Sequence, residues 1–346
     1  MQILVYILAA LMLLGIELAY IPIARRNRWS TERNRRADNH PVTVVGGGII
    51  FYVGMVIWSV ATGLVYGDNM PSANFIVGLT MLAACSFADD LMQLKVWIRL
   101  VVQTVATIFL GFQCIGFDVP LWLWPLYLLC TVGFINAYNF MDGINGITAA
   151  YSMVTLGTFM YLNQYVMHFV SGSMIMIAFI SVVIFAFFNF RRRAIVFAGD
   201  VGSICMGFIV ATLVIDYIVT TGDYLGFIFV IVYGVDTFLT VFRRLAEGEN
   251  IFMPHRKHIY QLLCHVWKVG QLKVAVGYAL LQGAISAVYI MLPAHGYDRA
   301  VDVSVTGIVL VAAYFVIMMA SESRRRHIQL MYESRRRRHG KRRRRK

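Results

Sequence analysis

Two adjacent carboxylates, Asp89 and Asp90, close a long apolar stretch of the chain in the segment "SFADDLMQL". Both side chains would be ionised near pH 7, so their repulsion must be offset by a cation or a basic partner between them. A divalent ion is the economical solution, and carboxylate oxygens suit Mg²⁺. A single Asp could simply mark the end of a membrane span, whereas an adjacent pair favours a functional site.

Three further segments combine Asp, Asn, Gly and His. "NFMDGING" carries Asp142 and Asn145 beside two glycines, although these residue types also form ordinary tight turns. "FAGDVGS" places Asp200 between two glycines just before a predicted helix, whose exposed backbone N–H groups could meet a phosphate. In "PHRKHIYQ", His255 and His258 flank two basic residues, either as a plain surface cluster or as donors to phosphate oxygens.

None of these segments is decisive alone, and "FAGDVGS" lacks the spacing of a Walker loop. Together they supply carboxylates for a metal ion, glycine-flanked Asp loops and a cluster of His and Arg. This combination predicts a site that handles a nucleotide diphosphate at a membrane surface.

The composition indicates which elements must position these segments. Hydrophobic residues make up 59% of the 346 residues, charged residues only 14%, and the mean hydropathy is +0.67. A soluble protein of this length would need more polar surface. We therefore predict an all-α, polytopic membrane protein with about eleven transmembrane helices. The predicted spans are 2–23, 45–66, 72–88, 98–114, 120–137, 147–165, 168–189, 203–220, 224–241, 272–292 and 302–320.

The distribution of basic residues predicts a periplasmic N-terminus and a cytoplasmic C-terminus. With that orientation, the inner segments contain all of the chain's 31 Lys and Arg except Arg299. These segments are 24–44, 89–99, 138–146, 190–202, 242–273 and the region from Ser321 onward. Such an asymmetry is what the positive-inside rule expects, and it places all the candidate segments on the cytoplasmic side.

We divide the chain into a single transmembrane catalytic domain, residues 1–320, and a basic cytoplasmic tail, residues 321–346. The tail ends in "KRRRRK" and dominates the net charge of +13. The simplest interpretation of the tail is a solvated anchor that fixes the orientation of the protein in the membrane. A more specific interpretation is that the tail is attracted to anionic lipids, at roughly 1 kcal/mol per basic residue. No nucleic-acid partner is expected for a tail tethered to a membrane.

Cysteine and glycine spacing adds two structural expectations. The cysteines are scattered and form no CxxC pair, which argues against a thiolate metal site or a disulfide framework. We interpret the run Gly46–Gly48 as a close helix contact rather than as a catalytic element.

The order of the motifs "DD…L…RL", "NxxNxMDGxxG" and "F.GDxGS", followed by a late His-rich loop, resembles the polyprenyl-phosphate N-acetylhexosamine-1-phosphate transferases of glycosyltransferase family 4. The resemblance implies that undecaprenyl phosphate attacks a cytoplasmic UDP-N-acetylhexosamine, takes the sugar-1-phosphate and releases UMP. It implies a requirement for Mg²⁺, with Mn²⁺ as an alternative, and a homodimer is left open. It also implies the bacterial inner membrane and the first membrane step of O-antigen or similar polysaccharide synthesis.

The matching motifs carry roles over to particular residues. Asp89 and Asp90 match the pair that includes the catalytic group which deprotonates or orients the lipid phosphate, and Asp200 matches a Mg²⁺ ligand. The residues expected to contact the nucleotide, the sugar or the diphosphate are Lys95, Asn139, Asp142, Asn145, His255, Arg256 and His258. One direct displacement and a phospho-aspartyl intermediate are both left open.

Two positions depart from the family pattern. Many relatives read "DGxDG", whereas this chain has Asn145 at the second acidic position, which puts the choice of nucleobase in doubt. The loop "PHRKHIYQ" looks most like those of O-antigen initiators that use deoxy-N-acetylhexosamines, and unlike the triple-His pattern of the peptidoglycan translocase. The sugar therefore stays open among GlcNAc, GalNAc, FucNAc and QuiNAc.

A cation-coupled membrane transporter is the main alternative, because acidic residues in polytopic proteins often bind ions. Transporters usually keep their site near the midplane, between repeated halves with broken spans. Here the acids gather at one face and no repeat is evident, so we favour the enzyme. A non-catalytic scaffold acting through the basic tail is a second alternative.

Overall fold

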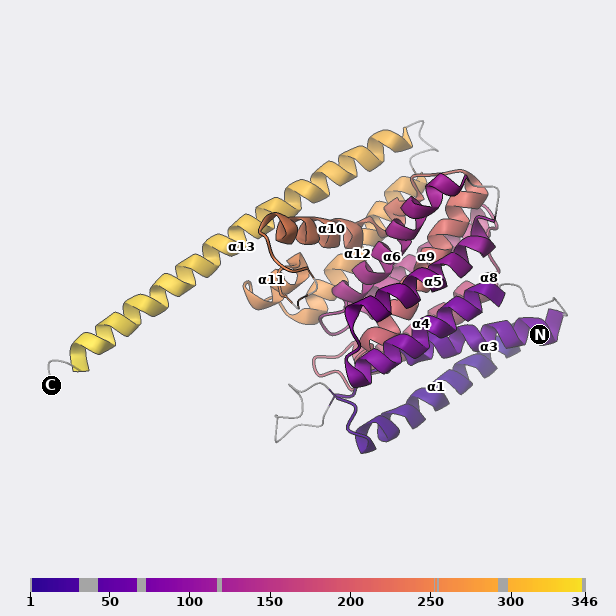
Figure 1. Cartoon of the computed structure of the whole chain (residues 1–346), viewed down its shortest axis with the longest axis horizontal. Coiled ribbons are helices and arrows are strands. Elements are labelled where there is room, and N and C mark those ends of the chain that lie inside the picture. The colour runs from indigo at the N-terminus through magenta and orange to yellow at the C-terminus, as the bar shows by residue number, and fades with distance from the viewer. Residues whose placement is uncertain are drawn as a thin grey trace.

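The computed structural model of the chain describes residues 2–30, 43–66, 73–116, 120–251, 253, 255–291 and 298–343, which form helices and no strand (Figure 1). The elements are α1 (Gln2–Arg26), α3 (Ile49–Tyr66), α4 (Ala73–Met92), α5 (Val96–Cys114), η1 (Leu121–Leu123), α6 (Trp124–Met141), α7 (Ile147–Tyr165), α8 (Gly172–Asn189), α9 (Gly199–Thr221), η2 (Gly226–Val230), α10 (Ile231–Ala246), α11 (Ile259–His265), α12 (Gln271–Met291) and α13 (Arg299–Arg343).

The prediction of an all-α membrane protein is confirmed. Among the described residues, 9 helices are long and apolar enough to cross a membrane. The two other predicted spans correspond to α3, whose apolar part Ile49–Leu64 is shorter, and to α7. The exact number of crossings and the orientation of the termini stay predictions.

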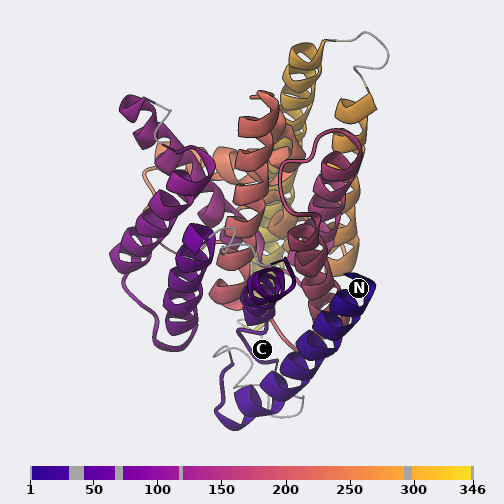
Figure 2. The same ribbon diagram turned by 90° about the vertical axis from the view of Figure 1, so that its right-hand side faces the viewer.

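Helix α9 forms the centre of the bundle (Figures 1 and 2). Of its most apolar 18-residue window, 78% is buried, compared with 17% for α1 and 6% for α13. It packs against α3, α4, α5, α6 and α7. Because α9 is enclosed by its neighbours, the position of its first turn, which carries Asp200, is set by packing on several sides.

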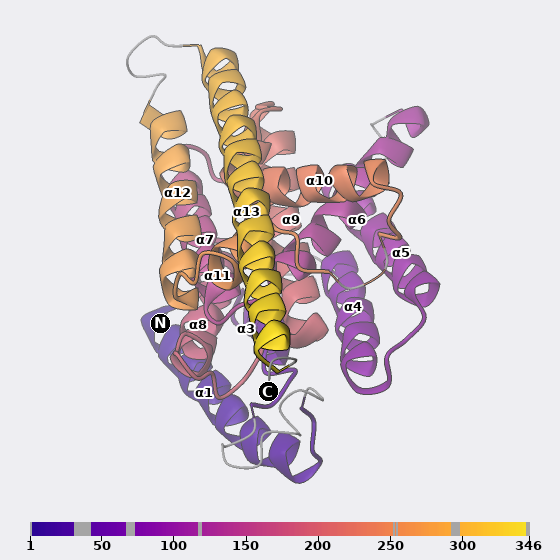
Figure 3. The same cartoon turned by 90° about the vertical axis from the view of Figure 1, so that its left-hand side faces the viewer.

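The last helix, α13, is continuous across the predicted boundary between residues 320 and 321. It contacts α10, α11 and α12 and then extends beyond the bundle (Figures 1 and 3). Up to Arg343, the basic region is therefore a prolongation of the last helix, and its separation as a tail stays a prediction.

Arg299, the exception to the charge asymmetry, has an ion-pair partner. Its Nη1 lies 2.9 Å from Asp223 Oδ2, in the turn between α9 and η2. The hydroxyls of Tyr217 and Tyr289 donate to the same carboxylate, at 3.1 and 2.8 Å. The ion pair thereby ties the start of α13 to the end of α9, which is a structural role for Arg299.

The Gly46–Gly48 run permits a close approach between chain segments, as predicted. A Cβ on Gly48 would lie 2.3 Å from Gly202 Cα and 2.8 Å from the Ala198 carbonyl oxygen, which are backbone atoms that cannot swing away. The Gly48 N–H donates to the same Ala198 oxygen at 3.1 Å. The start of α3 is therefore held directly against the first turns of α9.

We expect Gly48→Ala to destabilise the fold by about 1–3 kcal/mol, because the added methyl group must push two backbones apart. The matched control is Gly63→Ala on the same helix, where a Cβ would meet nothing within 4 Å. Thermal unfolding in detergent compares the two variants. Equal unfolding midpoints for both variants would contradict the close contact.

Candidate functional site

The carboxylate of Asp90 holds the N-terminus of α9. Its Oδ1 accepts the Asp200 N–H at 2.8 Å and its Oδ2 accepts the Val201 N–H at 3.1 Å. The first N–H groups of a helix lack partners within the helix, and the helix dipole favours negative charge at this end. Asp90 therefore caps α9 from a different helix, and joins the last turn of α4 to the first turn of α9.

This contact overturns one expectation about "FAGDVGS". Helix α9 begins at Gly199, so Asp200 lies within its first turn rather than before it. The prediction that these N–H groups meet a phosphate is wrong for Asp200 and Val201, because Asp90 already occupies them. Gly199 has a φ of +71°, and a Cβ there would lie 2.5 Å from Asp90 Oδ2. Glycine is therefore required both for the backbone conformation and for space.

Asp89 and Asp200 share one cation, the Arg99 guanidinium. Arg99 Nη1 lies 2.6 Å from Asp89 Oδ2 and 3.2 Å from Asp200 Oδ2. The other Asp89 oxygen accepts the Leu94 N–H at 2.6 Å. The Asp89 side chain is only 7% exposed, whereas those of Arg99 and Asp200 are 31% and 32% exposed. Asp89 is thus the buried member of the cluster, and Arg99 and Asp200 are its solvent-accessible members.

Two carboxylates of the cluster, those of Asp89 and Asp200, suit a magnesium ion whose remaining ligands come from outside the protein. No three His, Cys, Asp or Glu side chains converge on a common metal position among the residues that could be searched. Mg²⁺ is usually held by only one or two carboxylates, with waters and substrate phosphates completing its octahedron. Asp89 and Asp200, which already face one shared cation, are the residues that would hold it.

The "NFMDGING" turn lies against the start of α9. The Ser203 hydroxyl on α9 donates to Asn139 Oδ1 at 2.7 Å. The Thr148 hydroxyl donates to Asp142 Oδ1. Burial raises the pKa of Asp142 from 3.8 to about 6, although the Thr148 hydrogen bond opposes that shift. Asp142 is therefore a carboxyl group that exchanges its proton close to neutral pH.

The side-chain amide of Asn145 holds the backbone of a neighbouring turn. Its Nδ2 donates to the carbonyl oxygens of Arg191 and Arg192, at 3.0 and 3.3 Å. Its backbone N–H donates to Gln271 Oε1 at 3.0 Å, at the start of α12. A carboxylate has no hydrogen to donate to these carbonyls. Asn145, which stands where many relatives have Asp in "DGxDG", thus supplies the hydrogen-bond donor that holds the 190–193 turn.

In the late loop, a buried carboxylate orients His258. His258 is 1% exposed, and its Nδ1 lies 3.3 Å from Asp236 Oδ1 on α10. Asp236 also accepts the Ile259 N–H at 3.0 Å and the Tyr278 hydroxyl at 2.7 Å. His258 Nε2 is buried and has no hydrogen-bond partner among the described residues. One ring nitrogen is thereby anchored, and the other is a buried polar atom left without a partner in the described part of the protein.

Tyr260 joins this loop to the "NFMDGING" turn. Its hydroxyl donates to the Phe140 carbonyl oxygen at 2.9 Å, and it occupies the space that a Cβ on Gly143 would need, only 2.1 Å away. The His255 ring lies 4.9 Å from that of His258. Burial, followed by the nearby charges of His258 and Arg244, lowers the pKa of His255 to about 4. His255 is therefore neutral at physiological pH.

The predicted site residues fall into three sets. Asp89, Asp90, Asn139, Asp142, Asp200, His255 and His258 lie in segments that contact one another, whereas Asn145 faces the 190–193 turn. The side chains of Lys95 and Arg256 are exposed, with no hydrogen bond or ion pair to the part of the chain that the structure describes. The Lys next to Arg256, Lys257, pairs instead with Glu247 and Glu249.

Arg99 and Asp236 also belong to the site, although neither was among the predicted site residues. Arg99 follows the Asp pair within the same inner segment, but its two partners are separated from each other by the whole middle of the chain. Asp236 is the sole charged residue of the predicted span 224–241. Charge within an apolar span is a recognisable signal of a functional position, and it could have found Asp236.

Comparison with known proteins shows a shared region that contains most of this site. Residues 72–218 match the family described as Glycosyl transferase family 4. A Bacillus subtilis (strain 168) protein named "Probable undecaprenyl-phosphate N-acetylglucosaminyl 1-phosphate transferase" is 27% identical over 239 residues. That alignment covers 63% of this chain and 64% of the relative, so the chain spans less than two thirds of the relative's length.

Two further relatives are named "Phospho-N-acetylmuramoyl-pentapeptide-transferase". The one from Fervidobacterium nodosum is 26% identical over 243 residues, 64% of this chain and 74% of that protein. The one from Enterococcus faecalis is 26% identical over 263 residues, 67% of this chain and 79% of that protein. The resemblance found in the motifs is thereby confirmed.

We expect Asp236→Asn to destabilise the protein by about 1–3 kcal/mol, because an amide leaves at least one buried donor unpaired. Asp298→Asn is the matched control, since the side chain of that exposed residue accepts the Ala300 N–H and the Asn side chain can do the same. Thermal unfolding in detergent measures the difference. An unchanged midpoint for Asp236→Asn would mean that the carboxylate does not anchor the loop.

The raised pKa of Asp142 predicts that the stability of the fold depends on pH. Its pKa of about 6 in the fold exceeds the ordinary 3.8, so the folded chain binds this proton more tightly than the unfolded chain does. The resulting stabilisation is complete below about pH 4 and is lost as the pH rises through about 6. Asp142→Asn should therefore flatten the fall of the unfolding midpoint over this interval. An identical pH profile for the variant would contradict the raised pKa.

Proposed function

Because this chain is a relative of the glycosyl transferases of family 4, we propose that it transfers an N-acetylhexosamine-1-phosphate from a UDP-sugar to undecaprenyl phosphate. UMP is the second product. The reaction takes place at the cytoplasmic face of the bacterial inner membrane, as the first membrane step of O-antigen or similar polysaccharide synthesis. The observation that carries the proposal is the Asp89–Arg99–Asp200 cluster at the ends of membrane helices.

Asp89 and Arg99 suit the phosphate of the lipid acceptor. A polyprenyl phosphate buries its chain in the bilayer and keeps its phosphate at the interface, where α4 ends. The Arg99 guanidinium matches phosphate oxygens in geometry and charge, and it is partly exposed. We assign Asp89, beside it, to orienting the acceptor phosphate or taking its proton.

Asp200 and Asp89 would hold Mg²⁺, and Mn²⁺ would suit the same oxygens. The ion would neutralise charge on the diphosphate of the donor. We assign Asp90 a positioning role, because both of its oxygens are engaged by the backbone of α9.

The late loop and the "NFMDGING" turn suit the nucleotide sugar. His258 has a fixed orientation and a free Nε2, so it can donate a hydrogen bond to a phosphate oxygen. Asn139 and Asp142 lie on the adjoining turn and complete the polar lining. Arg256 and Lys95 are exposed side chains that can reach a bound anion from solvent.

The test uses the purified chain in vesicles with undecaprenyl phosphate, Mg²⁺ and a panel of UDP-N-acetylhexosamines. UMP release with a matching lipid-diphosphate sugar is expected for one donor, and EDTA should abolish it. Asp89→Asn and Asp200→Asn should each lower turnover by about 100-fold or more, since each removes charge at the reacting phosphates. Asp90→Asn should lower turnover and thermal stability together.

Asp298→Asn serves as the control and should keep its rate, because Asp298 lies at the start of α13, away from this cluster. Near-normal turnover in correctly folded Asp89→Asn and Asp200→Asn would refute the assigned mechanism. Absence of product with every donor, together with ion-dependent solute uptake, would favour the transporter instead.

A further inference from the structure

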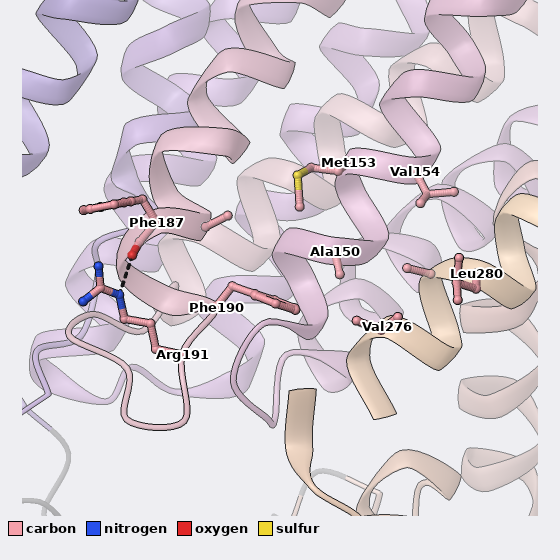
Figure 4. A pocket seen from close by; sticks show the side chains of 10 residues that line it. Ala150, Met153, Val154, Phe187, Phe190, Arg191, Val276 and Leu280 are labelled. Carbon is pink, nitrogen blue, oxygen red and sulfur yellow. Dashed lines mark hydrogen bonds between the residues drawn. The ribbon is translucent and has the colours of Figure 1, made fainter. Parts of the chain in front are cut away.

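An apolar groove lies between α7, α8 and α12 (Figure 4), helices that carry none of Asp89, Asp90 and Asp200. Its volume is about 520 Å³, within the range of small-molecule sites. Every lining side chain is apolar except Arg191. Phe187 on α8 and Leu280 on α12 are 64% and 66% exposed, so the groove opens towards the surrounding membrane. A hydrocarbon chain fits such a lining.

Positive charge stands at one end of the groove, where α8 ends. Arg191 lies with its guanidinium carbon 4.7 Å from the centre of the Phe187 ring, and its Nε donates to the Phe187 carbonyl oxygen at 2.7 Å. Figure 4 shows this side chain turned back along α8. Its Nη1 and Nη2 have no hydrogen bond or ion pair to the described residues, and neither do the exposed side chains of Arg192 and Arg193.

These three arginines gather positive charge at the end of α8. The end of α8 contributes roughly half a negative charge through its dipole, which three guanidinium groups outweigh. An arginine run beside an apolar groove between membrane helices combines the two features that a charged lipid needs. Basic pockets between such helices commonly bind anionic head groups.

We propose that this groove binds an anionic phospholipid, with an acyl chain along α7, α8 and α12 and its phosphate on Arg191–Arg193. The lipid acceptor of the proposed reaction is a poorer match. Its phosphate is expected beside Asp89 and Arg99, on α4 and α5, whereas the groove belongs to a different set of helices. The basic extension of α13 is also a different surface.

The bound lipid would brace the "NFMDGING" turn. Phe190 lines the groove, and its ring also lies where a Cβ on Gly146 would come within 2.4 Å. Asn189 Oδ1 accepts the Gly146 N–H at 2.8 Å. The Asn145 amide holds the carbonyls of Arg191 and Arg192. A lipid that orders the arginine run therefore also orders the turn that carries Asp142.

The first test measures lipid retention by the full chain in detergent, using native mass spectrometry with phosphatidylglycerol or phosphatidylcholine. We expect selective retention of phosphatidylglycerol. The combined change Arg191→Gln, Arg192→Gln and Arg193→Gln should weaken that retention at least about tenfold. The matched control, Arg324→Gln, Arg325→Gln and Arg326→Gln, removes the same charge from α13, away from the groove, and should weaken retention clearly less than the change at Arg191–Arg193 does.

A second pair of variants tests the groove itself. Ala186→Phe fills the groove and should reduce retention of phosphatidylglycerol, whereas Ala312→Phe, at an exposed position on α13, should not. Phosphatidylglycerol should also slow amide hydrogen exchange in residues 142–148, in the wild-type chain but not in the triple arginine variant.

Equal retention by the triple arginine variant and its control would overturn the proposal. Displacement of phosphatidylglycerol from the groove by one equivalent of undecaprenyl phosphate would overturn the choice of occupant. None of these measurements contains a transfer step, so their failure is distinguishable from failure of the proposed function.

Discussion

The contact between the Asp90 carboxylate and the first N–H groups of α9 is the interaction on which the rest of the site depends. It places a charge where the helix dipole stabilises it, and it satisfies two donors that would otherwise lie unpaired between packed helices. The same contact also fixes the distance between the end of α4 and the start of α9. Asp89 is the neighbour of Asp90 on α4, and Asp200 is the residue whose N–H binds Asp90. Fixing this one contact therefore brings Asp89 and Asp200 to the same guanidinium.

Close backbone contacts make this arrangement possible. Gly48 meets Gly202, and Gly199 leaves room for the Asp90 carboxylate. A side chain at any of these positions would move α3 or α4 away from α9 and separate the acids. The small residues therefore serve the chemistry indirectly, by allowing helices to approach until their polar ends meet.

The second half of the site depends on a buried polar network. Asp236 lies within an apolar helix, at a cost that its four hydrogen-bond partners offset, and it fixes both the ring of His258 and the start of α11. Tyr260 then ties that loop to the turn after α6. The same turn is braced from its far side by α8 and the arginine run. The proposed lipid groove and the proposed catalytic site thus share one structural element, which offers a physical route for the membrane to influence the reaction.

The sequence by itself determined the class of the protein and the region of its chemistry. The backbone inside a bilayer must satisfy its own hydrogen bonds, so the long apolar stretches marked the helices, and most of the acids and histidines of the site fell at helix ends or in the segments between helices. The motifs pointed to Asp89, Asp142, Asp200 and His258 as site residues, and the glycine run to a close contact.

Only the tertiary structure decided which groups meet. Asp90 bonds to residues 110 and 111 positions further along the chain, and Arg99 reaches Asp200 across 101 positions. Asn145 and the start of α9 were expected to face substrate, but both have partners in the protein. Local patterns encode helices and turns through short-range sterics and polarity. Pairings between distant segments depend instead on how closely the helices pack, which no single motif records.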